Sequence, residues 1–379
     1  MRRVLLVLPH SMEACNNTGI TIKNIFSLYP KDKLAEVCFS SLDKLDLENR
    51  IRFFEFNQRK RNNLIENFLY IQRCKKDVKF NRFIEDFQPE IIYCVCTTFQ
   101  TAIISKYISN KFRIPVLIHH FDNVLETGRL RWLLRIYYDS IGKKMCKGLV
   151  ISQDMKMHYE QKFKKQFEVL MNCVKHKEKY TYENTGIIMY AGGVHLDRIK
   201  SLLDVEHCIE KLNNEFNCNY KLVIYSNISE KGKQQFNQNL TCFNAPVTHD
   251  EIIKKYEEAE ILLHAESFQK ENFKFLKYSL TTKLPEYLIS GIPILCYAPQ
   301  ESSIYKFIKN NNCGFFASDH KTLEVELRRV LTKNNIRNTY INNAYSLAVT
   351  SFLDDRANRI LVDIIEENIM NYKNKGVIK

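Results

Sequence analysis

Two glutamates and a lysine are the side chains whose types and spacing first suggest chemistry. Glu266 follows the apolar run EILLHA, and Glu286 follows Lys283 in the segment TTKLPEYLISGIPIL. A carboxylate has two acceptor oxygens, which suit the vicinal hydroxyls of a ribose or another sugar. A lysine at the start of a helix can bind a diphosphate together with the helix N-terminus. The alternative for Glu286 is a contact with the helix dipole, which would contribute about 0.3 to 1 kcal/mol.

The residues around Glu286 predict a short helix. We expect Thr282 to be its N-cap, and Pro285 is tolerated in the first turn because its missing N–H would have no helical partner there. Gly291 is expected to end the helix in the left-handed conformation, and Pro293 prevents its continuation. Thr282 would then lie at the helix N-terminus, where a phosphate can bind.

A glycine pair ends another apolar run, in the segment GIIMYAGGVHLDR. Gly192 and Gly193 would let the backbone approach a ligand closely. Arg198 could reach a phosphate, because a guanidinium matches phosphate geometry with two hydrogen bonds. The GxGxxG spacing of dinucleotide-binding loops is absent. The alternative is a tight turn followed by a surface arginine.

Two loops in the first half of the chain also follow apolar runs. Asn17 and Gly19 lie just before a predicted helix, where backbone amides could hold a phosphate or an acceptor; a plain turn is the alternative. His119 and His120 come directly after IPVLI, with Asp122 close behind. A His–Asp pair can orient a general base. The alternative is a structural loop in which the aspartate caps a helix.

Apolar runs and helix-period segments alternate along the chain, which predicts α/β architecture with parallel sheets. The alternation stops in the polar segment 173–186 and then restarts. We therefore predict an N-terminal domain over 1–178, a C-terminal domain over 183–350, and a helix over 351–379 that packs back toward the N-terminal domain. Ligands of doubly wound sheets bind beyond the carboxyl ends of the strands. Two such Rossmann-like domains facing each other would place these loops around a cleft.

The composition excludes several classes of protein. The chain has 379 residues and 12 cysteines without a CxxC pair, which favours a reducing, cytoplasmic compartment. No His/Cys cluster has the spacing of a zinc site. No stretch approaches the roughly 20 apolar residues of a membrane span, and the first apolar run is too short for a signal peptide.

The net charge of +13 fits an anionic partner: nucleic acid, an anionic lipid surface or a phosphorylated small molecule. No nucleic-acid-binding motif is present. Segment 129–147 places basic residues among aromatic and aliphatic ones, as in helices that lie on an anionic membrane. The alternative is an amphipathic helix that packs on the core of its own domain.

The residues from Glu266 to Pro293 resemble the C-terminal half of retaining glycosyltransferases with the GT-B fold, particularly family 4 (group 1). The family pattern is a glutamate, a small residue and Phe, then a second glutamate followed by xxxGxPIL; ESF at 266–268 and EYLISGIPIL at 286–295 match it. The family commonly has seven residues between the glutamates, whereas residues 267–285 lie between them here. The polar run before PEYL looks like a subgroup that builds bacterial surface polysaccharides, such as capsule.

This resemblance implies transfer of a sugar from a nucleotide-sugar, with UDP as the expected nucleotide, and with retention at the anomeric carbon. Glu286 would bind the ribose and Glu266 the donor sugar hydroxyls, while Lys283 and Arg198 would bind the diphosphate. The other predicted contacts of the nucleotide-sugar are Gly19, Thr282, Gly192 and Gly193.

On the acceptor side, the resemblance implies that His119 or His120 with Asp122 lies near the reacting carbon, and Asn17 is expected nearby. No cofactor and no metal are expected. The acceptor would be a saccharide or a polyprenyl-diphosphate-linked saccharide at the cytoplasmic face of the inner membrane.

Two other functions fit the same sequence. One is a nucleotide-sugar epimerase with the same two-domain fold, which would need further acidic and histidine residues in the cleft. The other is a non-catalytic nucleotide-sugar-binding partner in a glycosylation complex. The position of both glutamates relative to the ligand would separate these from the transferase.

Overall fold

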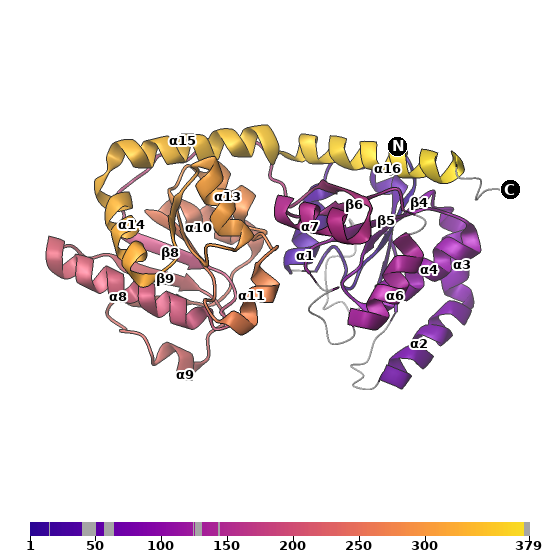
Figure 1. Cartoon of the computed structure of the whole chain (residues 1–379), viewed down its shortest axis with the longest axis horizontal. Coiled ribbons are helices and arrows are strands. Elements are labelled where there is room, and N and C mark those ends of the chain that lie inside the picture. Colours follow the sequence, from indigo (N-terminus) through magenta and orange to yellow (C-terminus); the bar gives the residue numbers. More distant parts are fainter. Residues whose placement is uncertain are drawn as a thin grey trace. The chain divides into compact units, whose positions relative to one another are not determined.

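The chain forms two compact units (Figure 1). The first consists of Met1–Cys173 and Asp354–Lys379, and the second of Val174–Leu353. The computed structural model describes residues 1–14, 16–39, 51–56, 64–123, 125, 131–142 and 145–374, without the side chains of 64–68, 131, 133, 134 and 137.

Seven parallel strands form the sheet of the first unit, in the order β3-β2-β1-β4-β5-β6-β7. The order reverses between β1 and β4, which is the arrangement of a doubly wound sheet. The strands are β1 (Val4–Val7), β2 (Leu34–Cys38), β3 (Arg52–Glu55), β4 (Ile91–Val95), β5 (Val116–His120), β6 (Lys147–Val150) and β7 (Gln166–Val169).

Helices cover this sheet, and side-chain caps begin several of them. The side chains of Asn16, Asp77, Thr98 and Ser152 each accept a hydrogen bond from a backbone N–H in the first turn. The last helix of the chain, α16, packs on α1 and on β5 and β6. The helices are α1 (Asn17–Ile25), η1 (Lys31–Lys33), α2 (Leu64–Lys76), α3 (Val78–Phe87), α4 (Phe99–Phe112), α6 (Arg131–Gly142), α7 (Gln153–Phe163) and α16 (Asp354–Asn374).

The second unit repeats this topology with six parallel strands in the order β10-β9-β8-β11-β12-β13. Its strands are β8 (Ile187–Ala191), β9 (Lys221–Tyr225), β10 (Thr241–Asn244), β11 (Ile261–Ala265), β12 (Ile294–Tyr297) and β13 (Phe315–Ala317). Its helices are α8 (Arg198–Phe216), α9 (Glu230–Lys233), α10 (His249–Lys255), η2 (Tyr256–Glu258), α11 (Lys270–Leu276), α12 (Leu284–Ser290), α13 (Ser303–Asn311), α14 (His320–Thr332) and α15 (Asn334–Ser351).

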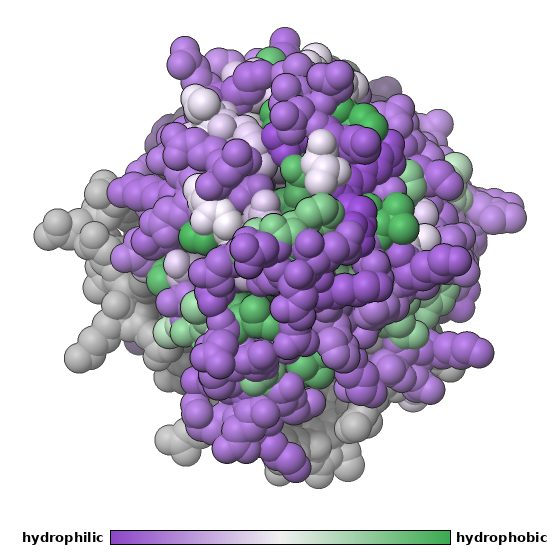
Figure 2. Space-filling view, turned by 90° about the vertical axis from the view of Figure 1, so that its left-hand side faces the viewer, coloured by the Kyte–Doolittle hydropathy of each residue, from purple (hydrophilic) through white to green (hydrophobic). Residues whose placement is uncertain are grey.

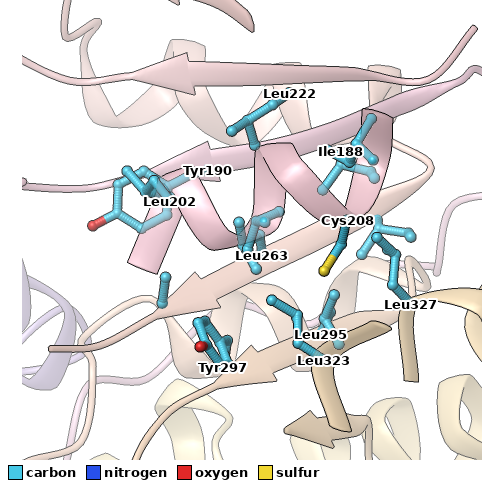
Figure 3. Packing of buried hydrophobic residues seen from close by; sticks show 14 of the residues in the cluster. Ile188, Tyr190, Leu202, Cys208, Leu222, Leu263, Leu295, Tyr297, Leu323 and Leu327 are labelled. Atoms are coloured by element: carbon cyan, nitrogen blue, oxygen red, sulfur yellow. The ribbon is translucent and has the colours of Figure 1, made fainter. Parts of the chain in front are cut away.

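The core of the second unit explains why its strands are continuous apolar runs. Figure 3 shows Leu202 and Cys208 of α8 packed against Leu263 of β11, and Leu323 of α14 close to Leu295 of β12. All five side chains are fully buried. A strand that is covered on both faces needs apolar residues at successive positions, not only at alternate ones. The face shown in Figure 2 is mostly hydrophilic, with apolar residues scattered over it.

The prediction of two doubly wound α/β domains is confirmed. Three strands have polar residues at half of their positions: β3, β7 and β10. Each lies at an edge of its sheet. Edge strands are short and partly exposed, so they lack the apolar run that identifies a central strand.

α2 and α3 are separate helices because Asp77 caps the second one. One predicted helical segment differs in its limits. The segment 129–147 contains α6 and the start of β6, and its residues 129, 130, 143 and 144 are outside the described part. Among the described residues, no helix is both long and apolar enough to cross a membrane.

Candidate functional site

The strand order of the second unit brings the predicted donor residues together. The order reverses between the neighbouring strands β8 and β11, and ligands of such sheets bind at the carboxyl ends of the strands at this reversal. Gly192 directly follows β8, and Glu266 directly follows β11. The glycine loop and the first glutamate therefore leave the sheet side by side.

Arg198 and Glu266 form a nearly buried ion pair at this point. Arg198 Nε donates to Glu266 Oε2 at 2.8 Å, and Nη2 lies 2.7 Å from the same oxygen. The exposed fractions of the two side chains are 15% and 9%. On the other carboxylate oxygen, His264 Nε2 lies 3.1 Å from Oε1, which is an ion-pair distance without the alignment of a hydrogen bond.

These basic neighbours keep Glu266 ionised. Burial alone would raise the pKa of Glu266, but His264 and Arg198 outweigh it and hold the pKa below its usual value. Ser201 Oγ donates to the backbone oxygen of Glu266 at 2.6 Å, which fixes the chain where β11 ends. The result is a positioned carboxylate at the strand end.

Lys283 lies beside the glycine loop. A Cβ atom on Gly192 would be 3.7 Å from Lys283 Nζ, so this glycine leaves the space next to the ammonium group unfilled. Burial is the main cause that lowers the pKa of Lys283, and the charge of Arg198 lowers it further. The carboxylates of Glu286 and Glu266 act in the opposite direction and raise it. A partly desolvated ammonium interacts more strongly with an anion than one in bulk water.

The glycine loop itself is held from several sides. Tyr190 OH donates to the backbone oxygen of Gly193 at 2.8 Å, and Arg198 Nη1 donates to the same oxygen at 3.3 Å. A Cβ atom on Gly193 would come within 2.6 Å of His195 Nδ1. Burial lowers the pKa of His195, and Arg198 lowers it further. The loop is thus compact, and a side chain at Gly193 would displace His195.

Glu286 is 4% exposed and is held by two side chains that the sequence analysis does not single out. The ring nitrogen Nε2 of His249 lies 2.8 Å from Glu286 Oε1, and Tyr256 OH donates to Oε2 at 3.4 Å. The hydrogen bond with Glu286 is the main reason why the pKa of His249 is raised. His249 begins α10, where a capping box of Thr248 and Glu251 fixes the first turn. That capping signal is visible in the sequence, but its proximity to Glu286 is not.

The helix that carries Glu286 begins one residue later than predicted. Its N-cap is Lys283, without a side-chain cap, so the prediction of Thr282 as N-cap is wrong. A turn precedes the helix instead, in which Leu284 N donates to Thr281 O at 3.1 Å. At the other end, Gly291 has φ +84° and ends the helix in the left-handed conformation, as predicted.

The long segment between the two glutamates forms a helix of its own. Asn272 of α11 donates to the backbone oxygen of Leu196 at 2.9 Å and to Ser267 Oγ at 3.1 Å. The segment therefore packs against the glycine loop, and α12 still begins beside the site. This explains how a longer spacing between Glu266 and Glu286 keeps both at the same edge of the sheet.

In the first unit, β5 ends with the two histidines. His119 and His120 pair in register with Leu149 and Val150 of β6. His119 is fully buried; its Nε2 lies 2.7 Å from Leu170 O, and Nδ1 contacts the hydroxyl of Tyr93. Burial lowers the pKa of His119 to about 3, so the ring is neutral.

His120 lies among aromatic rings, with centroids 5.1 Å from that of Tyr138 and 4.9 Å from that of Tyr159. Neither ring nitrogen has a hydrogen-bond partner among the described residues. Burial lowers its pKa to about 3. Asp122 is exposed, and no hydrogen bond in the described part joins it to His119 or His120. Surrounding protein raises the pKa of Asp122 to about 6; since the side chain is exposed, we expect solvent to reduce this shift.

The loop after β1 is built around Gly19, within the first turn of α1. The backbone N–H of Gly19 donates to Asn16 Oδ1 at 2.9 Å, and a Cβ atom there would collide with the carbonyl oxygen of Ala14. Asn17 is exposed at the start of the helix. The predicted acceptor-side and phosphate-binding roles of Asn17 and Gly19 stay predictions.

The site of the second unit combines two cations, Arg198 and Lys283, with two carboxylates, Glu266 and Glu286, at one edge of a sheet. The cations can bind a diphosphate, and the carboxylates can accept hydrogen bonds from hydroxyl groups on either side of it. No group of three or more His, Cys, Asp or Glu side chains within the described ranges is placed to hold a metal ion. The expectation that the reaction needs no metal stays a prediction.

Solved structures resemble this chain over nearly its whole length. Sucrose-phosphate synthase from Thermosynechococcus elongatus has a TM-score of 0.73 at 11% identity, covering 97% of this chain and 99% of that one. HepE from Anabaena in complex with UDP-glucose has a TM-score of 0.70 at 11% identity, covering 97% and 100%. A putative UDP-N-acetylglucosamine 2-epimerase from Listeria monocytogenes has a TM-score of 0.64 at 11% identity, covering 96% of each chain. No family model and no curated protein sequence matches the chain.

At such low identities the likeness concerns the fold. Both sheets are parallel and doubly wound, and the match extends over both units. The assignment to family 4 stays a prediction. The chain therefore has the two-domain GT-B fold of the glycosyltransferases, as its sequence predicts.

Proposed function

We propose that this protein is a retaining glycosyltransferase that uses a nucleotide-sugar, with UDP as the expected nucleotide. The observation that carries the proposal is the convergence of Arg198, Lys283, Glu266 and Glu286 at the strand reversal of the second sheet. The similar structure of HepE was solved with UDP-glucose, which supports a nucleotide-sugar as the ligand of this fold.

In this proposal each charged group has one partner on the donor. Lys283 and Arg198 bind the diphosphate, Glu286 accepts hydrogen bonds from the ribose hydroxyls, and Glu266 accepts them from the sugar. His249 and Tyr256 contact the two oxygens of Glu286 and hold the carboxylate in place. Arg198 takes part in both the diphosphate contact and the sugar contact, because it also forms an ion pair with Glu266.

Transfer breaks the bond between the anomeric carbon and the diphosphate oxygen, and forms a bond from that carbon to the acceptor oxygen. The electron pair of the broken bond leaves with the nucleoside diphosphate, and the proton of the acceptor hydroxyl is released. Lys283 and Arg198 stabilise the negative charge that grows on the leaving diphosphate. Removal of one such group costs on the order of 100- to 1000-fold in kcat in other enzymes.

We further propose that the acceptor is a saccharide or a polyprenyl-diphosphate-linked saccharide of a bacterial surface polysaccharide, used at the cytoplasmic face of the membrane. The support is the polar run before PEYL together with α6. Trp132 and Ile136, one helical turn apart, are 60% and 56% exposed, and Arg135 between them is also exposed. Tyr138 and Ile141 of the same helix are buried. Such a helix can pack on its own core and also contact an anionic surface.

The direct test of the activity is incubation with UDP-, GDP-, TDP- and CDP-sugars, with and without acceptors, followed by measurement of nucleoside diphosphate release. We expect turnover with one nucleotide, and a product with the anomeric configuration of the donor. A rise in melting temperature with that nucleotide should accompany it, because a ligand that binds only the folded state stabilises it. Absence of binding and turnover with every donor would refute the proposal.

The membrane contact has a separate test. The double variant Trp132→Ser, Ile136→Ser should lose sedimentation with phosphatidylglycerol vesicles, while Val325→Ser, an equally exposed residue of the second unit, should not. Equal sedimentation of all three proteins would rule out α6 as the contact.

An epimerase of the same fold is the second candidate, and the similarity to the putative 2-epimerase is the observation that favours it. An epimerase needs no acceptor and leaves the nucleotide-sugar intact. Nuclear magnetic resonance of the donor incubated with the protein alone would show a new epimer in that case, and only slow hydrolysis in the case of a transferase.

A further inference from the structure

A cavity of 530 Å³ lies at the amino edge of the first sheet. It is lined by residues that directly precede β1, β4 and β5, and by the ends of α3, α4 and α16. Substrates of doubly wound sheets bind at the opposite, carboxyl edge. The proposed transfer reaction therefore gives this cavity no role. Its volume falls within the range of small-molecule sites.

The lining combines an apolar wall with one buried, unpaired phenol. Ile84, Phe112, Ile114 and Ile369 supply the wall. Tyr372 lines the cavity from the last turn of α16 and is 4% exposed, yet its hydroxyl has no hydrogen-bond partner among the described residues. A buried hydroxyl without a partner typically costs about 1 to 3 kcal/mol, which a ligand oxygen would recover.

The charged groups of the lining favour an anion. Arg3, Arg113 and Lys373 bring three cations to the cavity. Its two acids are already engaged by cations from outside the lining: Glu90 by Arg2 at 3.0 Å, and Glu85 by Lys111 at 3.6 Å. The remaining polar side chains of the lining, Gln88 and Tyr372, can each donate a hydrogen bond.

The partial negative charges at the carboxyl ends of three helices neutralise the positive charge of these cations only in part. The carboxyl ends of α3 and α4 and the last turn of α16 face the cavity, and each carries about half a negative charge. Arg3 Nε donates to the terminal carbonyl of Gln88 at 2.8 Å and so satisfies the end of α3. Three full positive charges exceed what the helix ends neutralise.

We propose that this cavity is a second binding site, separate from the sugar-transfer site, for a small amphipathic anion with an apolar body and a carboxylate or phosphate head. The apolar wall of Ile84, Phe112, Ile114 and Ile369 takes the body. The head accepts hydrogen bonds from Tyr372 and from the cations around it.

The probes are 4-phenylbutanoate, 4-phenylbutyl phosphate and the neutral 4-phenylbutanamide, titrated into the full-length protein by calorimetry. We expect at least one anion to bind about tenfold more tightly than the amide, because charge-assisted hydrogen bonds are about twice as strong as neutral ones. The preferred anion distinguishes a carboxylate ligand from a phosphate ligand.

Two variants connect binding to the cavity. Lys373→Gln should weaken binding of the anion about tenfold, whereas Arg359→Gln, an exposed cation of the same helix outside the lining, should not. Tyr372→Phe removes only the unpaired hydroxyl, so it should fold normally and bind the anion several-fold less tightly.

Several results would overturn the proposal: no binding of either anion to the unaltered protein, equal affinity for the amide, or equal loss of affinity in Lys373→Gln and Arg359→Gln. Turnover with nucleotide-sugars is measured on the same preparations. Its presence or absence has no bearing on this outcome, since no residue of the cavity belongs to the donor site.

Discussion

Glu286 is distinguished from the many surface carboxylates by what surrounds it. It is almost fully buried, and His249 and Tyr256 each contact one of its oxygens. A contact with the helix dipole requires no such partners and would contribute about 0.3 to 1 kcal/mol. The environment of Glu286 therefore fits a positioned acceptor of hydrogen bonds from a ligand.

Substitution of Glu286 by Gln tests this role. The amide keeps the shape of the side chain but offers only one acceptor oxygen, so kcat/KM for the nucleotide-sugar should fall on the order of 10- to 100-fold. At pH 9, where His249 has lost its proton, the melting temperature should change little. Glu258→Gln, an exposed carboxylate paired with Lys255, is the matched control and should keep full activity. Unchanged kcat/KM in Glu286→Gln would restore the helix-dipole explanation.

His249 should make stability depend on pH. Its pKa is raised above the ordinary value of 6.5 by Glu286, so the folded state holds the proton more tightly than the unfolded state. This stabilisation is complete below about pH 6.5 and is lost as pH rises through the folded-state pKa. Because the side chain of His249 is 28% exposed, we expect about 1 kcal/mol, or about 2 to 4 °C in melting temperature.

The comparison is therefore between unaltered protein and His249→Gln, melted at pH 5.5 and at pH 9. The advantage of the histidine should be present at the lower pH and disappear at the higher one. A difference that grows with pH would show that the imidazole stabilises the protein in its neutral form.

Among the elements, α12 depends on the glycine that ends it. Gly291 has φ +84°, and a Cβ atom there would come within 2.7 Å of Tyr180 O and of Lys179 Cβ. The same turn receives Tyr180, whose backbone N–H donates to Ser290 O. The end of α12 is thus packed directly against the first segment of the second unit.

Gly291→Ala should lower the free energy of unfolding by at least about 1 to 2 kcal/mol, because alanine is strained in the left-handed conformation and has no space here. Gly142→Ala is the matched control. It lies at the end of α6, where no described atom other than those of its chain neighbours and its own helix backbone lies within 4 Å of the added Cβ, and it should raise stability by up to about 1 kcal/mol. Urea unfolding of both variants measures this, and a loss as small in Gly291→Ala as in the control would disprove the strain.

At the scale of the whole molecule, the first unit is completed only when the chain returns to it as α16. Asn368 of α16 is 1% exposed and accepts hydrogen bonds from Cys146 N at 2.8 Å and Lys147 N at 3.3 Å. It also donates to Lys147 O at 3.0 Å. Arg2 adds an ion pair with Glu366 at 2.8 Å. The last helix is therefore hydrogen-bonded to the start of β6.

Asn368→Ala should lower the stability of the protein by about 1 to 3 kcal/mol, because it leaves partly buried backbone groups of Cys146 and Lys147 without this partner. Asn371→Ala, three residues further along the same helix, removes one hydrogen bond to the helix's own backbone and should cost less than about 0.5 kcal/mol. Unfolding of the two variants in urea distinguishes them. Similar losses would mean that Asn368 does not connect α16 to β6.

The sequence by itself determined the order of elements and the chemical types at the ends of the central strands. The apolar runs of β8 and β11 can be recognised in the sequence because both faces of each strand are covered. The Gly192–Gly193 pair and Glu266 are the residues that come directly after these runs. The sequence also predicts where a helix ends if a local residue determines that end, as Gly291 does. The edge strands cannot be recognised in this way, because their partly exposed residues carry no continuous apolar pattern.

Only the tertiary structure decided which of these residues meet. Arg198 and Glu266 are 68 residues apart, and His249 and Glu286 are 37 apart, so their pairing follows from the strand order and from no local pattern. The same is true of His119, whose ring contacts the backbone oxygen of Leu170, 51 residues further along the chain. Residue types record what chemistry is available, whereas contacts depend on how distant segments pack, and packing is a property of the folded chain as a whole.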